Sequence, residues 1–142
     1  NTRVHTQHKD LYISQKRVLK HLPEDLCPFW DLEFGDGDEQ PRDSSSAVIA
    51  ACGMLEMSKY MEKADSEYYT SVALKLLKQM IDKYSVKDPK KSNGLLLMGT
   101  YSKKSPYNTC TEAGVDECVI WGDYFYMEAL YRVLDPEWKS YW

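Results

Sequence analysis

The sequence predicts an all-α protein in which an inner layer of apolar helices is covered by an outer layer of one-faced helices, that is, amphipathic helices with a single apolar face. Residues 41–61 and 120–134 are apolar on most sides once past their first few positions. A helix of that kind has to be enclosed by other helices. Residues 9–22 and 66–84 carry one apolar face each, which is typical of helices lying outside a core. This alternation predicts a stack of helical hairpins.

The first predicted helix covers residues 9–22 and ends at Pro23, because proline cannot continue a helix. Its apolar side chains recur on one face at helical spacing: Leu11, Tyr12, Val18, Leu19 and Leu22. Its basic side chains take the opposite face: Lys16, Arg17 and Lys20. We therefore expect this helix to lie on the outside of the core.

Residues 23–42 form a first long loop, with three prolines, two glycines and no helical period. A loop of this length inside a compact domain is usually either functional or disordered. The loop also carries Phe29, Trp30 and Phe34. Because disordered segments are poor in aromatic residues, this cluster favours an ordered and functional loop.

The central helix is expected to begin at Asp43 and the serines that follow it, since short oxygen side chains accept hydrogen bonds from the first N–H groups of a helix. Its small residues let neighbouring backbones come close: Ala47, Ala50, Ala51 and Gly53. Residues 63–66 are expected to form a turn and a new cap. The one-faced helix of residues 66–84 follows from there.

A second long loop precedes the last helix. Residues 94–102, an apolar run between glycines, predict a buried extended segment or a short strand, and residues 103–118 are polar and irregular. The last helix is expected to start at Ile120 or Gly122 and to run to Leu134, before an Asp-Pro stop. Since each long loop leads into an inner helix, a functional site is expected where the inner helices begin.

Composition narrows the possible functions. A length of 142 residues allows one domain with its own core, and a net charge of −4 argues against nucleic acid as a partner. No apolar run is long enough to cross a bilayer, so no membrane partner is expected. Because the chain begins at Asn1 without a methionine, we expect residues 1–142 to be a single partial domain of a longer protein.

The histidines and cysteines show no metal-ligand spacing. His5, His8 and His21 lie on or near the first helix and are expected at the surface. The four cysteines contain no C-x-x-C pair. We expect reduced thiols, with a bridge between Cys110 and Cys118 as the alternative. Neither a metal nor another cofactor is expected.

Four motifs follow one another along the chain: P-E-D-L-x-P-F-W-D at 23–31, P-R-D-S-S-S-A at 41–47, G-T-Y-S at 99–102 and V-D-E-C-V-I-W-G-D-Y-F-Y-M-E-A-L at 115–130. Together they resemble glycoside hydrolase family 88, the unsaturated glucuronyl hydrolases. The resemblance implies that the chain is the C-terminal part of an (α/α)6 barrel, whose N-terminal portion is its partner. It also implies a bacterial protein of the cytoplasm.

The resemblance implies an unusual hydrolysis of oligosaccharides made by polysaccharide lyases. Such oligosaccharides end in a uronic acid with a C4=C5 double bond. In the family, an aspartic acid protonates C4, water adds at C5, and the resulting hemiketal collapses to release the next sugar. The motifs that carry the family's catalytic aspartates do not occur in this sequence, so no catalytic residue is assigned to it.

Six residues are candidates for substrate binding by this resemblance. Arg42 and Asp43 would orient a carboxylate or hydroxyl of the sugar at the barrel mouth. The alternative is that Asp43 only caps the central helix, with Arg42 as its ion partner. Trp30 would form a wall on which a sugar stacks, or else a hydrophobic plug that holds the loop down.

The remaining candidates are Tyr101, Ser102 and Ser105, which form Y-S-x-x-S. In family members that act on sulfated fragments, two serines at this spacing and a lysine two residues later contact the sulfate. Here the lysine position holds Tyr107, which departs from the pattern. Plain solvent-exposed serines are the alternative interpretation. We expect the Trp121-Gly122-Asp123 start of the last helix to be structural, with Asp123 favourable to the helix dipole.

Two other functions are consistent with parts of the pattern. The hairpin alternation alone would suit a non-catalytic helical-repeat scaffold that binds proteins, which predicts charged concave faces and short loops. A related barrel enzyme, an unsaturated rhamnogalacturonyl hydrolase, would share the reaction. The pairing of P-R-D-S-S with D-E-C-x-I-W-G-D-Y favours family 88.

Overall fold

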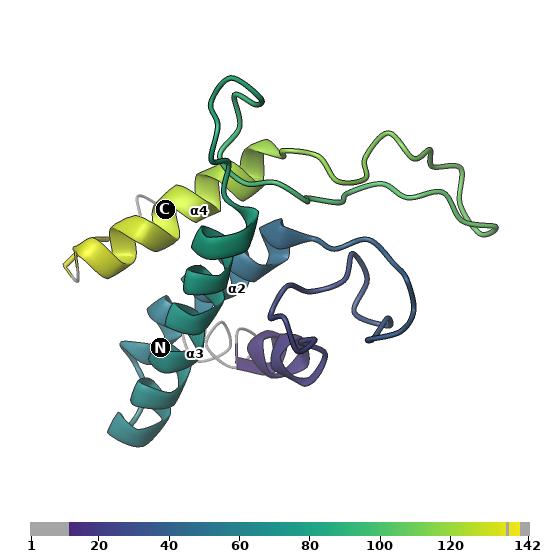
Figure 1. The fold of residues 1–142 in the computed structure, drawn as a ribbon. Coiled ribbons are helices and arrows are strands. Elements are labelled where there is room, and N and C mark those ends of the chain that lie inside the picture. The colour runs from purple at the N-terminus through teal and green to yellow at the C-terminus, as the bar shows by residue number, and fades with distance from the viewer. Residues whose placement is uncertain (1–11, 136, 140–142) are drawn as a thin grey trace.

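A computed structural model describes residues 12–135 and 137–139. The helices are α2 (Ser44–Ser58), α3 (Lys63–Gln79) with its π-helical continuation η1 (Met80–Tyr84), and α4 (Ile120–Leu134), and residues 12–20 are also helical (Figure 1). Extended pairing in this part of the chain is limited to isolated bridges. The prediction of an all-α fold is confirmed. None of the helices in the described residues is long and apolar enough to span a membrane.

Helix α2 is the centre of the fold. Ala47, Val48, Ala51 and Met54 are fully buried along it, each with 0% of its surface exposed. One side of α2 packs with α3 and the 12–20 helix, and another packs with α4. The small alanines allow this close approach, and each large side chain removed from water contributes roughly 1.5–3 kcal/mol. The expected inner and outer layers are therefore present.

The helix of residues 12–20 lies on the outer layer, as its one apolar face predicts. Tyr12, Val18, Leu19 and Leu22 pack against the cluster between α2 and α3. The ring of Tyr12 meets that of Tyr69 edge-on, with centroids 6.2 Å apart. Residues 9–11 of the predicted helix, and the histidines at positions 5 and 8, lie outside the described residues.

The predicted start of the one-faced helix is wrong by about one turn. Helix α3 begins at Lys63, and the N–H of Ser66 donates to the carbonyl of Glu62 at 2.9 Å, as an interior helical residue does. Asp65 lies in the first turn, where a carboxylate favours the helix dipole, instead of capping it. At the other end, the π-helical turn of η1 brings the hydroxyl of Tyr84 to 3.2 Å from Asp25.

The two long loops lead into the N-termini of α2 and α4, and both extend to the right in Figure 1. Within the second loop, Gly99 pairs with Glu117, and Ser102 pairs with Gly114. The segment 94–102 is extended as expected, but it is buried only in part. Leu96 is 2% exposed whereas its neighbours Leu95 and Leu97 are 39% and 38% exposed. No strand forms in it because its pairing is confined to single bridges.

The cysteines are reduced, as predicted. Cys27 and Cys52 are buried, Cys110 is exposed and Cys118 is half-buried, and all four are free thiols. Burial raises the pKa of Cys27 to about 12, despite a hydrogen bond to Tyr84 that lowers it. A thiol with so high a pKa stays protonated at neutral pH and is a poor nucleophile. Burial likewise raises the pKa of Cys52 to about 12, so both buried cysteines are structural.

Candidate functional site

Asp43 ties the start of α2 to the second loop. Its Oδ1 accepts hydrogen bonds from the N–H and the hydroxyl of Ser45, at 3.1 and 2.6 Å. The same oxygen accepts from the N–H of Thr100 at 3.4 Å. Ser44 adds two further links, since its N–H donates to the carbonyl of Met98 and its hydroxyl to that of Leu97. Asp43 therefore has the helix-cap role that its sequence context predicts.

Arg42 is fully engaged by the first loop. Its guanidinium donates to the carbonyl of Cys27 at 3.0 Å and forms ion pairs with Asp25 and Asp36, at 3.2 and 3.6 Å. It also lies 3.8 Å from the ring centroid of Phe29, in a cation–π contact. The carboxylates that pair with it are those of the loop, whereas Asp43 bonds to α2. These contacts make Arg42 the residue that holds the first loop folded on itself.

An aromatic pair lies beside Asp43, where α2 and α4 both begin. The indole N–H of Trp121 donates to the hydroxyl oxygen of Ser45 at 3.2 Å. The rings of Tyr101 and Trp121 meet edge-on, with centroids 5.6 Å apart. Both rings keep open surface, since Tyr101 is 58% and Trp121 is 40% exposed. The sequence pattern led us to expect a structural role for Trp121. The feature that could have indicated this exposed pair is an aromatic residue in the first turn of an inner helix.

Gly122 and Asp123 have the structural roles expected of them. A Cβ on Gly122 would lie 3.2 Å from the Cβ of Ser45, so glycine lets the starts of α4 and α2 touch. The carboxylate of Asp123 accepts from the N–H groups of Leu95 and Leu96, at 3.0 and 2.9 Å. The two contacts fix the second loop to α4 just before Tyr101.

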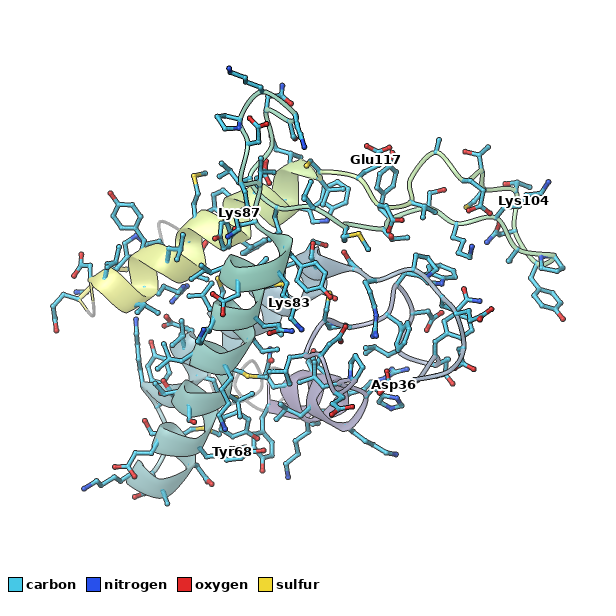
Figure 2. The ribbon with its side chains drawn as sticks, in the orientation of Figure 1. Asp36, Tyr68, Lys83, Lys87, Lys104 and Glu117 are labelled. Carbon is cyan, nitrogen blue, oxygen red and sulfur yellow. The ribbon has the colours of Figure 1, made fainter. Side chains whose placement is uncertain are left out.

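A cleft of about 380 Å³ lies between the two long loops. It is lined on one side by residues of the first loop and on the other by residues of the second: Trp30, Asp31, Phe34 and Gln40, then Lys103, Lys104, Ser105, Pro106 and Tyr107. Asp36 of the first loop and Lys104 near the end of the second loop both lie on the right-hand side of Figure 2. The structure thus brings two predicted site residues, Trp30 and Ser105, to one cleft.

The ring of Trp30 has a fixed orientation in this cleft. Its indole N–H donates to the side-chain oxygen of Gln40 at 3.2 Å, and its ring centroid lies 6.0 Å from that of Phe34. Arg42 lines a different cavity, of about 500 Å³, together with Asp25, Asp36 and residues of α3 and η1. Five of the six candidate residues are therefore divided between separate places, namely the cleft, the helix starts and the outer cavity.

The serines of the second loop differ in how much hydrogen-bonding capacity they retain. The hydroxyl of Ser102 donates to the carbonyl of Thr111 at 3.3 Å, so its proton is used within the loop. The hydroxyl oxygen of Ser105 accepts from the N–H of Tyr107 at 3.2 Å, which leaves its proton available for a ligand. Lys103 pairs with Glu112 at 3.6 Å. Lys104 forms no ion pair with any of the described residues.

The fold and the site together define a class of protein. The inner helices α2 and α4, the outer helix α3, and the loops that lead into the inner-helix N-termini form a two-layered helical protein whose cleft is lined by aromatic and polar side chains. No protein-family model matches the chain.

Sequence comparison finds relatives among bacterial enzymes. The chain is 44% identical over 126 residues to an unsaturated chondroitin disaccharide hydrolase of Streptococcus pyogenes, covering 87% of this chain and 30% of that protein. It is 32% identical over 139 residues to an unsaturated glucuronyl hydrolase of Bacillus sp. strain GL1, covering 94% and 35%. The chain thus spans about a third of the length of these relatives, the two shares being 30% and 35%.

Structural comparison agrees. The crystal structure of the unsaturated glucuronyl hydrolase from Streptococcus agalactiae superposes with a TM-score of 0.79 at 42% identity, covering 90% of this chain and 31% of that one. Over about a third of their length, the chain is similar to the unsaturated glucuronyl hydrolases of glycoside hydrolase family 88, and its helices correspond to part of their (α/α)6 barrel. The resemblance and the fold predicted from the four motifs are confirmed.

Proposed function

We propose that the complete protein removes an unsaturated uronic acid from the non-reducing end of lyase-generated oligosaccharides, by hydration of the C4=C5 double bond. Sequence identity of 44% to an enzyme named for this type of substrate supports the proposal. The observation in this chain that most supports the proposal is that Trp30 and Ser105, far apart in sequence, line one cleft. A fixed aromatic ring faced by hydroxyls and lysines suits an anionic sugar.

The residues of this chain would bind and orient the substrate and leave the proton transfers to others. The motifs that carry the family's catalytic aspartates are absent from the sequence, and acid–base chemistry needs a carboxyl group within reach of the reacting carbon. We propose that residues 1–142 form a single partial domain and that the rest of the barrel completes the site. The cytoplasmic location expected from the resemblance stays a prediction.

A crystal structure of the D175N mutant of the Streptococcus agalactiae enzyme is a complex with dGlcA-GalNAc6S, so that enzyme binds this disaccharide. A substrate of this class fits the cationic side of the cleft, where Lys104 is free of ion pairs with the described residues. The scaffold hypothesis required short loops and charged concave faces. The structure instead has two long loops with aromatic side chains, which favours the enzyme.

The first test is an activity assay on two proteins. The full-length protein is expected to consume the double bond of unsaturated chondroitin disaccharides, followed as loss of ultraviolet absorbance. The 142-residue chain alone is expected to give no turnover, because no catalytic carboxyl is assigned to it. Turnover by the short chain would show that the catalytic assignment is wrong. A full-length protein inactive on all unsaturated uronides would refute the function itself.

A second test asks whether Lys104 and Ser105 of the second loop contact the substrate. In the full-length enzyme, the double change Lys104→Ala and Ser105→Ala is expected to raise KM for a sulfated disaccharide about tenfold, since about 1.4 kcal/mol of charge-assisted hydrogen bonding corresponds to that factor. The change in kcat is expected to be small, as for uniform binding. Tyr107→Lys, which adds a cation to the same cleft, is expected to lower this KM.

The matched control is Lys90→Ala, which removes an exposed lysine in the turn that follows η1. It is expected to leave both constants unchanged. If the double variant behaves like this control on sulfated and unsulfated substrates alike, the loop does not contact the sugar.

A further inference from the structure

The aromatic pair Trp121–Tyr101 is held by a continuous chain of hydrogen bonds that begins at Asp43. The indole N–H of Trp121 donates to the hydroxyl oxygen of Ser45, and that hydroxyl donates to Oδ1 of Asp43. The same Oδ1 accepts from the N–H of Thr100, the residue before Tyr101. The chain therefore joins the starts of α2 and α4 to the backbone that carries Tyr101.

The hydrogen bond and the ring contact fix the positions of Trp121 and Tyr101 and leave part of each ring exposed. Trp121 uses its one polar atom inward, on Ser45, while 40% of its surface stays exposed. The rings of Tyr101 and Trp121 meet edge to face, at an interplanar angle of 80°, and 58% of the surface of Tyr101 is still exposed. A tryptophan or tyrosine that only fills a core keeps little open surface.

Trp121 also differs from the other exposed apolar residues of α4. Ile120, Met127 and Leu134 recur on one side of the helix at spacings of seven residues, which is typical of a helix–helix seam. Trp121 is offset from that seam by about 100°, the turn per residue of an α-helix. It lies instead toward α2, where its indole N–H donates to Ser45 in the first turn of that helix.

We propose that Trp121 and Tyr101 form a sugar-stacking platform at the mouth of the barrel, distinct from the Trp30 cleft, and that Asp43 and Ser45 are positioning residues which hold it. The ligand class is the pyranose ring of an unsaturated oligosaccharide, so the proposal rests on the proposed function. Apolar C–H faces of sugars suit the π-faces of such rings. The hydrogen-bond chain fixes the platform without touching the sugar.

The experiment uses the full-length enzyme and three readouts. Trp121→Ala and Tyr101→Ala are each expected to raise KM for unsaturated disaccharides about tenfold, the factor that about 1.4 kcal/mol represents. Trp121→Phe, which keeps a ring but lacks the N–H, and Ser45→Ala are each expected to have a smaller effect. Their double variant is expected to be no worse than either alone, because both remove the same hydrogen bond.

Binding is measured separately with a saturated disaccharide of the same composition, which has no double bond to consume. This sugar is expected to quench tryptophan fluorescence in the wild type and in Trp138→Phe. The quench is expected to be smaller in Trp121→Phe, because the part that comes from Trp121 is lost while the part from Trp30 remains. Trp138 is the matched control because its ring lies over Arg132, 4.4 Å from the guanidinium and close to the other end of α4.

The outcomes separate this proposal from the proposed function. A wild-type enzyme that is inactive on all unsaturated disaccharides refutes the function, whereas the fluorescence quench still reports on the platform. An active enzyme whose KM and quench are unchanged in Trp121→Ala and Tyr101→Ala refutes the platform. A lower melting temperature with unchanged KM also refutes the platform, since it shows that the pair only supports the fold.

Discussion

Replacing Arg132 by methionine is expected to cost the full-length protein about 3–5 kcal/mol of unfolding free energy, the usual range when one partner of a buried ion pair is removed. The side chain of Arg132 is 7% exposed and that of Glu128 is 4% exposed. Their nitrogen and oxygen atoms lie 2.8 Å apart. Without Arg132, the Glu128 carboxylate would stay buried with no compensating charge.

Arg132 also connects two inner helices. It bonds to Glu56 of α2, which in turn accepts from Lys59 at 3.1 Å. Partial burial would raise the pKa of Glu56, but the hydrogen bonds from Arg132, Lys59 and Tyr60 together hold that pKa below its usual value. The carboxylate of Glu56 is thus ionised in the folded protein and faces a guanidinium. The network fixes α4 against α2 at the end opposite the loops.

The measurement is chemical denaturation of the wild type and three variants. Lys78→Ala removes an exposed ion pair between α3 and Asp82 of η1, and is expected to cost far less because solvent screens such a pair. The double change Arg132→Met with Glu128→Leu is expected to recover much of the loss, because no unpaired charge remains. If Arg132→Met costs no more than Lys78→Ala, the buried network contributes little and this prediction is wrong.

Local sequence signals predicted most of the helices because their causes are local. Asp43 caps α2 through Ser45, two residues away, and the apolar period of residues 120–134 reproduces the bounds of α4. The start of α3 was missed because Asp65 and Ser66 suit the first turn of a helix as well as a turn before it. The π-helical turn has no sequence signal, since tertiary contacts such as Tyr84 with Asp25 determine it.

The candidate site was harder to predict because its contacts join distant segments. The Trp121 bond to Ser45 spans 76 residues, and no local pattern reports it. One of the two alternatives paired Arg42 with its neighbour Asp43, yet Asp25 and Asp36 bind it once the first loop folds back. The cleft that unites Trp30 with Ser105 forms because the two loops lie side by side where they lead into the N-termini of α2 and α4.

The 142-residue chain on its own is expected to self-associate and to bind a hydrophobic dye, because α4 presents an uncovered apolar face. Four residues spaced for a helix–helix seam are well exposed on it: Ile120 at 81%, Met127 at 49%, Tyr131 at 62% and Leu134 at 80%. Exposed apolar surface of that extent drives association. We expect the rest of the barrel to cover this face in the complete protein, since the chain spans 30% of its relative from Streptococcus pyogenes.

A single change, Met127→Lys, is therefore expected to act in opposite directions in the two proteins. In the short chain the lysine is exposed, so it should reduce self-association and dye binding, measured by light scattering and fluorescence. In the full-length protein the same lysine would be buried without a partner, which should lower the unfolding free energy by more than about 2 kcal/mol. Ile81→Lys, on the exposed side of η1, is the control and should do neither. A full-length protein that tolerates Met127→Lys as well as this control would show that α4 faces solvent, and that the barrel closes along another helix.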